Sequence, residues 1–234
     1  GEVMSRVALV TGGTRGIGAA ISLALKDAGY KVAANYAGNS AAADEFSRDT
    51  GIPTFRWSVA DYEACKAGIA EVEAALGPVD VLVNNAGAGA ILPLIDATAD
   101  RIQDIFAVNV LGPSLLATAA LPFLTETEGA IINVSSTFGH KPAAGLSHYA
   151  ASKAALEHLT RCWALELASR RIRVNAVAAG PTESGALTGM MGLSPEQAEV
   201  IKEQERERIP LKRRGEANDV ARWIVALADP ASHW

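Results

Sequence analysis

The sequence is poor in cysteine and has no concentrated positive charge. Cys65 and Cys162 are its two cysteines, and both fall within helical patterns, so we expect reduced side chains and a cytoplasmic location. The net charge is -5, and the one basic cluster, Lys212–Arg214, reads as a solvated loop, which argues against a nucleic-acid or anionic-membrane surface. The four histidines lack metal-ligand spacing to cysteines or carboxylates, so no metal site is predicted.

Long uninterrupted apolar segments are also scarce. A strand pattern begins by Val7, which leaves too little room for the charged head and apolar middle of a signal peptide. The uncharged stretch Ile105–Thr125 contains Asn109 and Pro113, and it indicates a helix buried at a protein interface rather than a membrane span. Of 234 residues, 49% are hydrophobic, enough to close one core without disulfides or metal. We therefore predict a single domain over residues 1–234.

Short apolar, β-branched runs alternate with helical patterns along the chain. This alternation predicts an α/β fold with a parallel sheet covered by helices on both faces. Two helical patterns end at Gly29 and Gly77, and Ser194 followed by Pro195 and Gln197 predicts the start of a separate charged helix. The predicted strands are Val7–Thr11, Lys31–Tyr36, Thr54–Ser58, Val79–Asn84, Ala130–Ser135 and Ile172–Ala178.

A glycine-rich turn, Thr11–Gly18, follows the first predicted strand and leads into a helix. This arrangement directs free main-chain N–H groups and the positive end of the helix at a pyrophosphate. Its spacing, Gly-x3-Gly-x-Gly, differs from the commoner dinucleotide fingerprint. The alternative is a tight turn without a ligand, which would need one or two glycines. The position at the first strand–helix junction favours a dinucleotide.

The end of the second predicted strand bears on the choice of cofactor. A carboxylate there would bind the ribose hydroxyls of NAD and repel the extra phosphate of NADP, but Asn35–Ser40 contains none. We expect Arg15, with Asn39 or Ser40, to hold a 2'-phosphate. The sequence thus favours NADP(H) and leaves NAD(H) open, the alternative being that Arg15 is an ordinary solvated residue.

Tyr149 and Lys153 lie four residues apart at the start of a helical pattern, so both project from one face. Ser136 stands at the carboxyl end of a predicted strand, where open α/β sheets bind ligands. A phenol has an ordinary pKa of about 10, and an ammonium group about 4 Å away stabilises its ionised form enough for acid–base chemistry near neutral pH. Ser136 would donate a hydrogen bond to the substrate oxygen.

Asn109 is a further candidate because Pro113 follows it at helical hydrogen-bonding distance. Pro113 has no N–H, so the main-chain carbonyl of Asn109 would lose its usual partner and could hold a water leading from Lys153 to solvent. The alternative is a proline kink that only shapes helix packing.

Assembled, these residues resemble the short-chain dehydrogenase/reductase family over essentially the whole chain. The resemblance implies a Rossmann-type doubly wound sheet, a catalytic tetrad of Asn109, Ser136, Tyr149 and Lys153, a small carbonyl or alcohol substrate, and a homotetramer or homodimer packed through the long helices. Its further markers are Asn84-Asn85-Ala86-Gly87 and Ala179-Gly180-Pro181-Thr182. The candidate cofactor-binding residues are Gly12, Thr14, Arg15, Gly16, Ile17, Gly18, Asn35, Tyr36, Asn39, Ser40, Ser58, Val59, Asn85, Ala86, Gly87, Tyr149, Lys153, Gly180, Pro181, Thr182 and Ser184.

Three departures from the family pattern stand out. Ser58 replaces an aspartate that contacts adenine, and Ala179-Gly180 replaces Pro-Gly. The sequence also ends at Trp234, before the family's last strand, which implies either a truncated sequence or a sheet without that edge strand.

The function implied is hydride transfer between NADP(H) and a carbonyl or secondary alcohol. The amino-terminal part resembles acetoacetyl-CoA reductases, whereas residues after about Gly89 resemble broader bacterial oxidoreductases, which suggests a mosaic. A 3-oxoacyl thioester reductase is one alternative, and a non-catalytic nucleotide-binding module or a truncated inactive form is another. We expect residues 185–210 to form a substrate lid, with Leu187, Met190, Met191 and Leu193 lining an apolar pocket; the alternative is an ordinary surface excursion.

Overall fold

The computed structural model describes residues 5–234, and the first four residues of the predicted domain lie outside the described part. These residues form a single domain around a six-stranded parallel sheet with the order β3-β2-β1-β4-β5-β6. The strand order changes direction between β1 and β4, and open α/β sheets bind ligands outside the carboxyl ends of the strands at such a point. The strands are β1 Val7–Val10, β2 Lys31–Tyr36, β3 Thr54–Arg56, β4 Val81–Asn84, β5 Ala130–Ser136 and β6 Arg173–Ala179.

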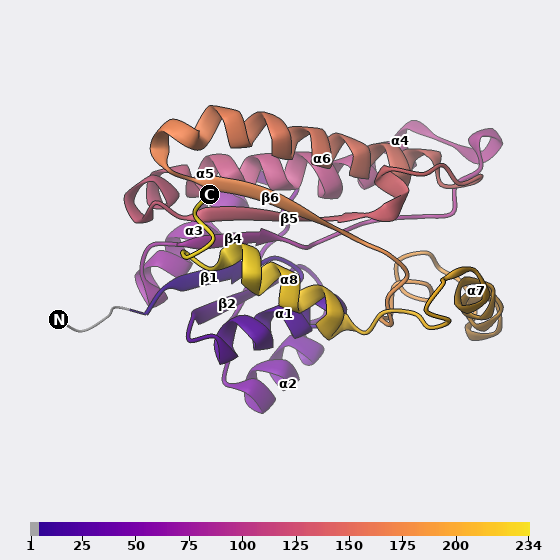
Figure 1. The fold of residues 1–234 in the computed structure, drawn as a ribbon, viewed down its shortest axis with the longest axis horizontal. Coiled ribbons are helices and arrows are strands. Elements are labelled where there is room, and N and C mark those ends of the chain that lie inside the picture. The colour runs from indigo at the N-terminus through magenta and orange to yellow at the C-terminus, as the bar shows by residue number, and fades with distance from the viewer. Residues whose placement is uncertain (1–4) are drawn as a thin grey trace.

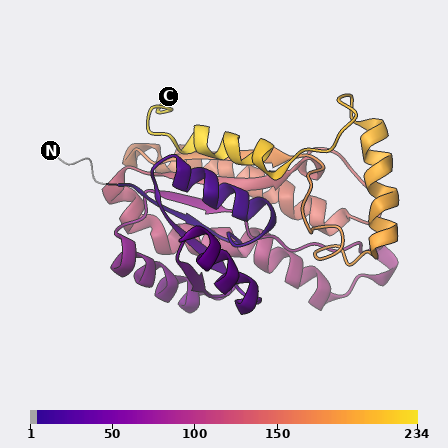
Figure 2. The same cartoon turned by 90° about the horizontal axis from the view of Figure 1, so that it is seen from below.

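Helices cover both faces of the sheet, as predicted for a Rossmann-type fold (Figure 1). Helices α3, α5 and α6 pack on one face, and α1, α2 and α8 pack on the other. Helix α7 lies beyond one end of the sheet in both views (Figure 2). The helices are α1 Gly16–Asp27, α2 Ser40–Thr50, α3 Tyr62–Leu76, α4 Ala99–Phe106, α5 Gly112–Thr127, α6 Ser147–Leu167, α7 Pro195–Arg208 and α8 Ala217–Ala228.

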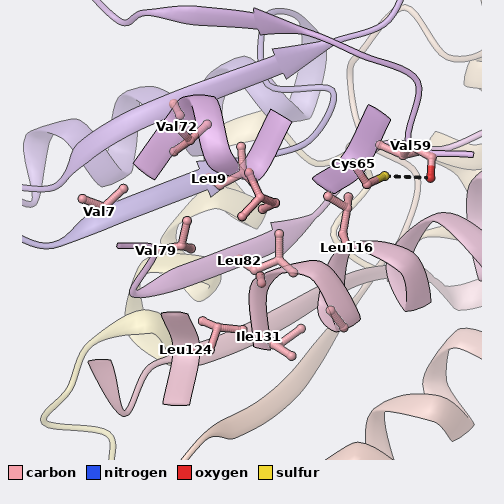
Figure 3. Close-up of a cluster of buried hydrophobic side chains, with 14 of the residues drawn as sticks. Val7, Leu9, Val59, Cys65, Val72, Val79, Leu82, Leu116, Leu124 and Ile131 are labelled. Carbon is pink, nitrogen blue, oxygen red and sulfur yellow. Dashed lines mark hydrogen bonds between the residues drawn. The ribbon is translucent and has the colours of Figure 1, made fainter. Parts of the chain in front are cut away.

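The core on the α3–α5–α6 side is closely packed around β1 and β4 (Figure 3). Leu9 and Leu82 from the sheet meet Leu116 and Leu124 of α5, all with almost no exposed surface. Cys65 belongs to this core, where its thiol donates a hydrogen bond to the Val59 carbonyl at 3.3 Å. Burial raises the pKa of the Cys65 thiol to about 11. The helical patterns predict small core residues at both cysteines, which is correct for Cys65 and wrong for Cys162, because Cys162 is exposed.

The predicted helix ends agree with the structure where a few neighbouring residues determine them. Gly29 and Gly77 adopt positive φ angles of 95° and 109° just after α1 and α3, conformations that favour glycine. Ser194 and Gln197 form the expected capping box at the start of α7, with Pro195 at the first helical position. Within the described residues the sheet ends at β6, in line with a missing last strand.

One continuous helical stretch, Ala99–Thr127, is long and apolar enough to cross a membrane by length and composition. It consists of α4, a π-helical turn over Ala107–Leu111, and α5. Because core helices of soluble proteins pass the same test, this is weak evidence for a span, and α5 packs against the sheet in the hydrophobic core.

Candidate active site

The glycine-rich turn has a shape that only glycine permits at several positions. Gly12 and Gly16 have positive φ angles of 57° and 56°. A Cβ on Gly18 would lie 1.9 Å from the Gly12 carbonyl oxygen, so the first turn of α1 and the preceding loop approach each other without room for a side chain. The requirement for three glycines exceeds what a simple tight turn needs and supports the dinucleotide interpretation.

The amino-terminal end of α1 carries no cap. Arg15 occupies the capping position, but its side chain makes no capping hydrogen bond. Within residues 5–234, the main-chain N–H groups of Gly16, Ile17 and Gly18 have no protein acceptor. Uncapped N–H groups at the positive end of a helix bind anions, so the turn fits the pyrophosphate of a nicotinamide dinucleotide.

The turn is tied to the loop that follows β4. The Thr11 hydroxyl accepts hydrogen bonds from the main-chain N–H groups of Asn85 and Ala86, at 3.0 and 2.9 Å. The Asn85 side chain donates to the carbonyls of Thr11 and Gly12. A Cβ on Gly12 would lie 3.2 Å from the Ala86 Cα, so the two loops are in direct contact. This contact forms the floor of the crevice between β1 and β4.

Asn35 plays a different part from the one its position suggested. It is buried, and its side chain accepts from the Gly12 N–H at 3.4 Å and donates to the Trp57 carbonyl at 3.1 Å. The Asn35 carbonyl also accepts from Gly13 N–H. The side chain therefore holds the glycine turn against β2 and β3, and it positions the cofactor site from behind.

The residues after β2 are exposed and neutral. Asn39 caps α2 through a hydrogen bond from Ala42 N–H, Ser40 begins that helix, and Tyr36 ends β2. The sequence analysis missed Arg56, the last residue of β3, which pairs in register with Tyr36 and donates from its Nε to the Ala37 carbonyl at 3.2 Å. Arg56 could be found only from the pairing of β3 with β2, which places these two segments side by side.

Ser58 and Val59 follow β3 at the same edge of the sheet. Ser58 is exposed, and its hydroxyl accepts from Ala60 N–H at 3.3 Å. Val59 is buried against α5, where a Cβ on Gly112 would lie 2.8 Å from the Val59 Cγ2. Val59 thus faces the core with its side chain, and its main chain alone is available to a cofactor.

Tyr149, Ser136 and Lys153 come together at the carboxyl end of β5. Ser136 ends β5; its hydroxyl accepts from the Phe138 N–H at 3.1 Å and is near enough to the Tyr149 phenol to lower the pKa of that group. Lys153 follows Tyr149 by one turn of α6, and its Nζ lies 6.0 Å from the centre of the Tyr149 ring. The three candidate catalytic side chains thus lie at the same edge of the sheet.

The Tyr149 pKa differs from the sequence expectation. Burial raises the pKa of its phenol above the ordinary value, and the Ser136 hydrogen bond lowers it by less. The Lys153 Nζ donates to the Val134 carbonyl at 3.0 Å, and Lys153 itself is buried. Burial lowers the Lys153 pKa to about 8, while the charge of Glu157 raises it.

Asn109 lies in the π-helical turn Ala107–Leu111 and is buried. Its side-chain amide bonds to both main-chain groups of Ala88, accepting from N–H at 2.8 Å and donating to the carbonyl at 2.7 Å. It also donates to the Ser152 hydroxyl at 3.0 Å. One amide thereby joins the loop after β4, the long helix and α6. The interrupted helix at Asn109 agrees with the predicted effect of Pro113 and is typical of functional sites.

The segment predicted as a lid covers this crevice. A Cβ on Gly89 would lie 3.0 Å from the Met190 Sδ, the Met191 Cε and the Tyr149 Cδ2, so both methionines pack beside the catalytic tyrosine. Ser184 lies across from the glycine turn, 3.7 Å from where a Cβ of Gly16 would be.

The two ends of the lid meet at its base. Thr182 bridges to Gly215, and Gly215 exchanges main-chain hydrogen bonds with Pro181 and Glu183. The buried Arg214 donates to the Thr182 carbonyl and forms ion pairs with Glu183 at 3.0 Å and Glu205 at 3.5 Å. Gly180 precedes this base at the carboxyl end of β6, so the whole Gly180–Thr182 marker lies at the root of the lid.

A cleft of about 680 Å³ lies between β6 and α8; Gly180, Pro181 and Thr182 line it, but none of the four tetrad residues does. The glycine turn and the tetrad instead share the edge formed by the carboxyl ends of β1, β4 and β5. The lid methionines fill the space beside Tyr149 at that edge.

Comparison with known proteins gives consistent matches over nearly the whole chain. The family model described as enoyl-(acyl carrier protein) reductase matches residues 12–234. An acetoacetyl-CoA reductase of Shinella zoogloeoides and one of Rhizobium meliloti are each 45% identical over 226 residues, covering 96% of this chain and 91% of the relative. A 3-oxoacyl-[acyl-carrier-protein] reductase of Staphylococcus aureus is 39% identical over 231 residues, with the same coverage. One continuous match spans both parts of the chain, and the mosaic origin stays a prediction.

Proposed function

Because the chain belongs to the short-chain dehydrogenase/reductase family, whose reductases use a nicotinamide cofactor, we propose that this oxidoreductase reduces the ketone of a 3-oxoacyl thioester with NADPH. The observation that carries the proposal is the meeting of Tyr149, Ser136 and Lys153 beside the uncapped glycine turn. The substrate class rests on similarity to acetoacetyl-CoA and 3-oxoacyl-[acyl-carrier-protein] reductases.

The choice of NADPH rests on charge at the adenosine end. Residues 35–40 at the end of β2 contain no carboxylate, Arg56 bonds to that segment, and Arg15 is exposed in the glycine turn. An arginine fork matches the geometry of a phosphate, and its charge would favour the 2'-phosphate of NADPH over the hydroxyl of NADH. Gly16 to Gly18 would hold the pyrophosphate, and Asn85, Ala86 and Gly87 would line the cofactor between the two loops. When bound, the nicotinamide supplies the hydride.

Side chains of the protein would supply the proton. Ser136 and Tyr149 would both donate hydrogen bonds to the substrate oxygen, which orients the carbonyl carbon and stabilises the growing negative charge. Tyr149 would then give its proton to that oxygen. The Lys153 ammonium stabilises the phenolate left behind, and Asn109 keeps α6 and the loop after β4 in register during the exchange.

The lid, residues 185–210, would close over the acyl portion of the substrate. Met190 and Met191 already lie beside Tyr149, and methionine adapts its shape to irregular apolar ligands. We further propose a homodimer or homotetramer packed through the long helices, and a cytoplasmic location, which the unpaired cysteines support.

The test uses purified protein with acetoacetyl-CoA, longer 3-oxoacyl thioesters and simple ketones, each with NADPH and NADH. We expect the highest kcat/KM for a 3-oxoacyl thioester with NADPH, and Tyr149→Phe should lower kcat by about 100-fold or more while NADPH fluorescence still reports binding. Full activity in Tyr149→Phe would contradict the mechanism, and a tenfold preference for NADH would contradict the cofactor.

Two other outcomes separate the competing functions. A preference for simple ketones over thioesters would favour a general carbonyl reductase. Cofactor binding without turnover of any substrate would favour a nucleotide-binding module or an inactive truncated form, which size measurements would then distinguish.

A further inference from the structure

A second cleft, of about 420 Å³, opens between α6 and β6 on the solvent side of the catalytic helix. Glu157 lies in its wall, one helical turn after Lys153, with a carboxylate that is only 8% exposed. A buried carboxylate is costly unless its oxygens are partnered, so its contacts indicate what it does.

Three groups converge on the Glu157 carboxylate from the segment that carries Ser136. The Ser135 hydroxyl donates to Oε1 at 2.7 Å, and the His140 Nε2 lies 3.0 Å from the same oxygen. A Cβ on Gly139 would lie 3.0 Å from both carboxylate oxygens. Glycine at 139 therefore lets the chain after β5 wrap closely around the carboxylate, which is a built position rather than a chance contact.

The same cluster reaches the main chain of the catalytic lysine. The Ser135 hydroxyl, which donates to Glu157, also lies 3.5 Å from the Lys153 carbonyl oxygen. Lys153 itself has one direct polar contact in the described residues, from its Nζ to the Val134 carbonyl. A carbonyl neutralises no charge. Glu157 follows Lys153 by four residues on α6, so both lie on one face of the helix, and the negative charge of Glu157 raises the Lys153 pKa that burial lowers.

We propose that Glu157 is a positioning residue for the reduction proposed above, in which its buried carboxylate keeps Lys153 in the charged form that Tyr149 needs. His140 closes the cluster toward solvent, with 64% of its side chain exposed. The proposal rests on the proposed function for its consequence in turnover, but not for the electrostatic coupling itself.

The other charged groups around Glu157 fix the direction of the effect. From α6 these are Lys153 and Arg161, from the turn after β5 it is His140, and β6 contributes the uncharged Asn175. Replacement of Glu157 by glutamine removes the one negative charge and leaves three basic groups. The Lys153 ammonium then loses stabilisation and releases its proton at a lower pH.

The experiment compares wild type with Glu157→Gln by two readouts. Lysine ε-carbons labelled with ¹³C report the Lys153 titration by NMR, with the signal assigned through Lys153→Arg. We expect the Lys153 midpoint to fall by about half a pH unit or more, and the alkaline limb of kcat/KM to move down by the same amount. Turnover should therefore drop severalfold near pH 8.5 and little near pH 6.5.

Matched variants separate electrostatics from folding. Glu157→Asp keeps the negative charge, so its Lys153 midpoint should lie close to the wild-type value. Glu166→Gln changes an exposed carboxylate on the same helix and should leave the Lys153 midpoint in place. If Glu157→Gln does not fold, the comparison uses Glu157→Asp and Ser135→Ala instead. Ser135→Ala removes the hydroxyl that donates to Glu157, so it should shift the alkaline limb of kcat/KM. An unchanged Lys153 midpoint in folded Glu157→Gln would overturn the proposal. Because the NMR titration needs no turnover, an inactive wild type would count against the proposed function alone.

Discussion

Lys153 is an ammonium group with almost no water around it. Its residue is 5% exposed, and its Nζ has a single carbonyl partner. The folded protein therefore disfavours the charged form, which is why the Lys153 pKa lies at about 8 instead of its usual 10.5. In the proposed mechanism, this charge stabilises the neighbouring Tyr149 phenolate at a cost to the stability of the fold.

The first prediction follows from that penalty. Lys153→Met should raise the free energy of unfolding at pH 7 by roughly 2 kcal/mol while abolishing turnover. Below pH 8 the lysine is charged in both states, so the penalty is complete. Between about pH 8 and 10.5 the unfolded chain binds the extra proton, so wild-type stability rises toward that of the variant. Urea unfolding at several pH values measures the free energy of unfolding of wild type and of Lys153→Met. A variant less stable than wild type at pH 7 would contradict the prediction.

Gly89 supplies a second prediction at the same scale. Gly89→Ala places a methyl group 3.0 Å from Met190, Met191 and the Tyr149 ring, so the ring or the methionines must move. We expect kcat/KM to fall by about tenfold, because misplacement of a proton donor by less than 1 Å is costly. Met190→Ala in the same chain should restore part of the loss by making room. Steady-state kinetics on the single and double variants decide it, and additive losses would show that no crowding exists.

The residues found from sequence alone are those whose roles depend on short spacing. Tyr149 and Lys153 lie one helical turn apart, and the glycines of the turn lie within a few residues of one another, so local geometry suffices. Arg56 and Glu157 escaped notice because their neighbours come from other strands. Asn35 was placed at the right strand end, but the direction of its side chain depends on Trp57, whose position no local pattern reveals.

At the scale of elements, the lid is a long excursion whose two ends are fastened together. Arg214, with a side chain that is 4% exposed, links Glu183 at the start of the lid with Glu205 on α7. Lys202 of α7 also pairs with Glu183 at 3.1 Å. The ion cluster thus fixes α7 to the chain at the end of β6, so within the predicted lid only residues 185–194 lie outside this fastening.

Arg214→Met should loosen that base. Removing the buried guanidinium leaves Glu205 without its ion-pair partner and Glu183 with Lys202 alone, which costs about 3 kcal/mol. We expect a lower melting temperature, faster proteolysis within residues 185–194, and a higher KM for substrate. The adjacent Arg213→Met is the control, because its pair with Asp219 is largely exposed and worth little. Equal effects of the two substitutions would refute a latch at Arg214.

The elements themselves were largely predictable, for reasons that differ along the chain. The start of α7 was placed correctly because Ser194 and Gln197 satisfy the helix end by themselves. Strand β3 is shorter than predicted, ending at Arg56, because Trp57 turns into the core. The base of the lid could not be predicted, since it depends on Gly215 meeting Pro181 across more than thirty residues.

At the scale of the whole molecule, the outer side of the long helices carries exposed apolar side chains. Leu165 of α6 is 84% exposed and Leu111 of the π-helical turn is 47% exposed. If the chain forms the proposed homodimer or homotetramer through these helices, Leu165→Lys should place a charge in the contact and weaken association by about 100-fold. Sedimentation velocity measures the mass, with Val200→Lys on α7 as the control. A monomeric wild type, or an unchanged mass in Leu165→Lys, would rule out this interface.

The sheet has two unlike borders. Strand β3 spans only Thr54–Arg56, whereas β6 spans Arg173–Ala179 and, unlike the fully buried β5, has mostly half-buried residues. A long strand with main-chain donors and acceptors facing outward is a template for a further strand from another molecule. At high concentration, unwanted polymerisation of this protein should therefore begin along β6, and a proline at an outward-facing N–H of that strand is the most direct way to make the protein easier to handle.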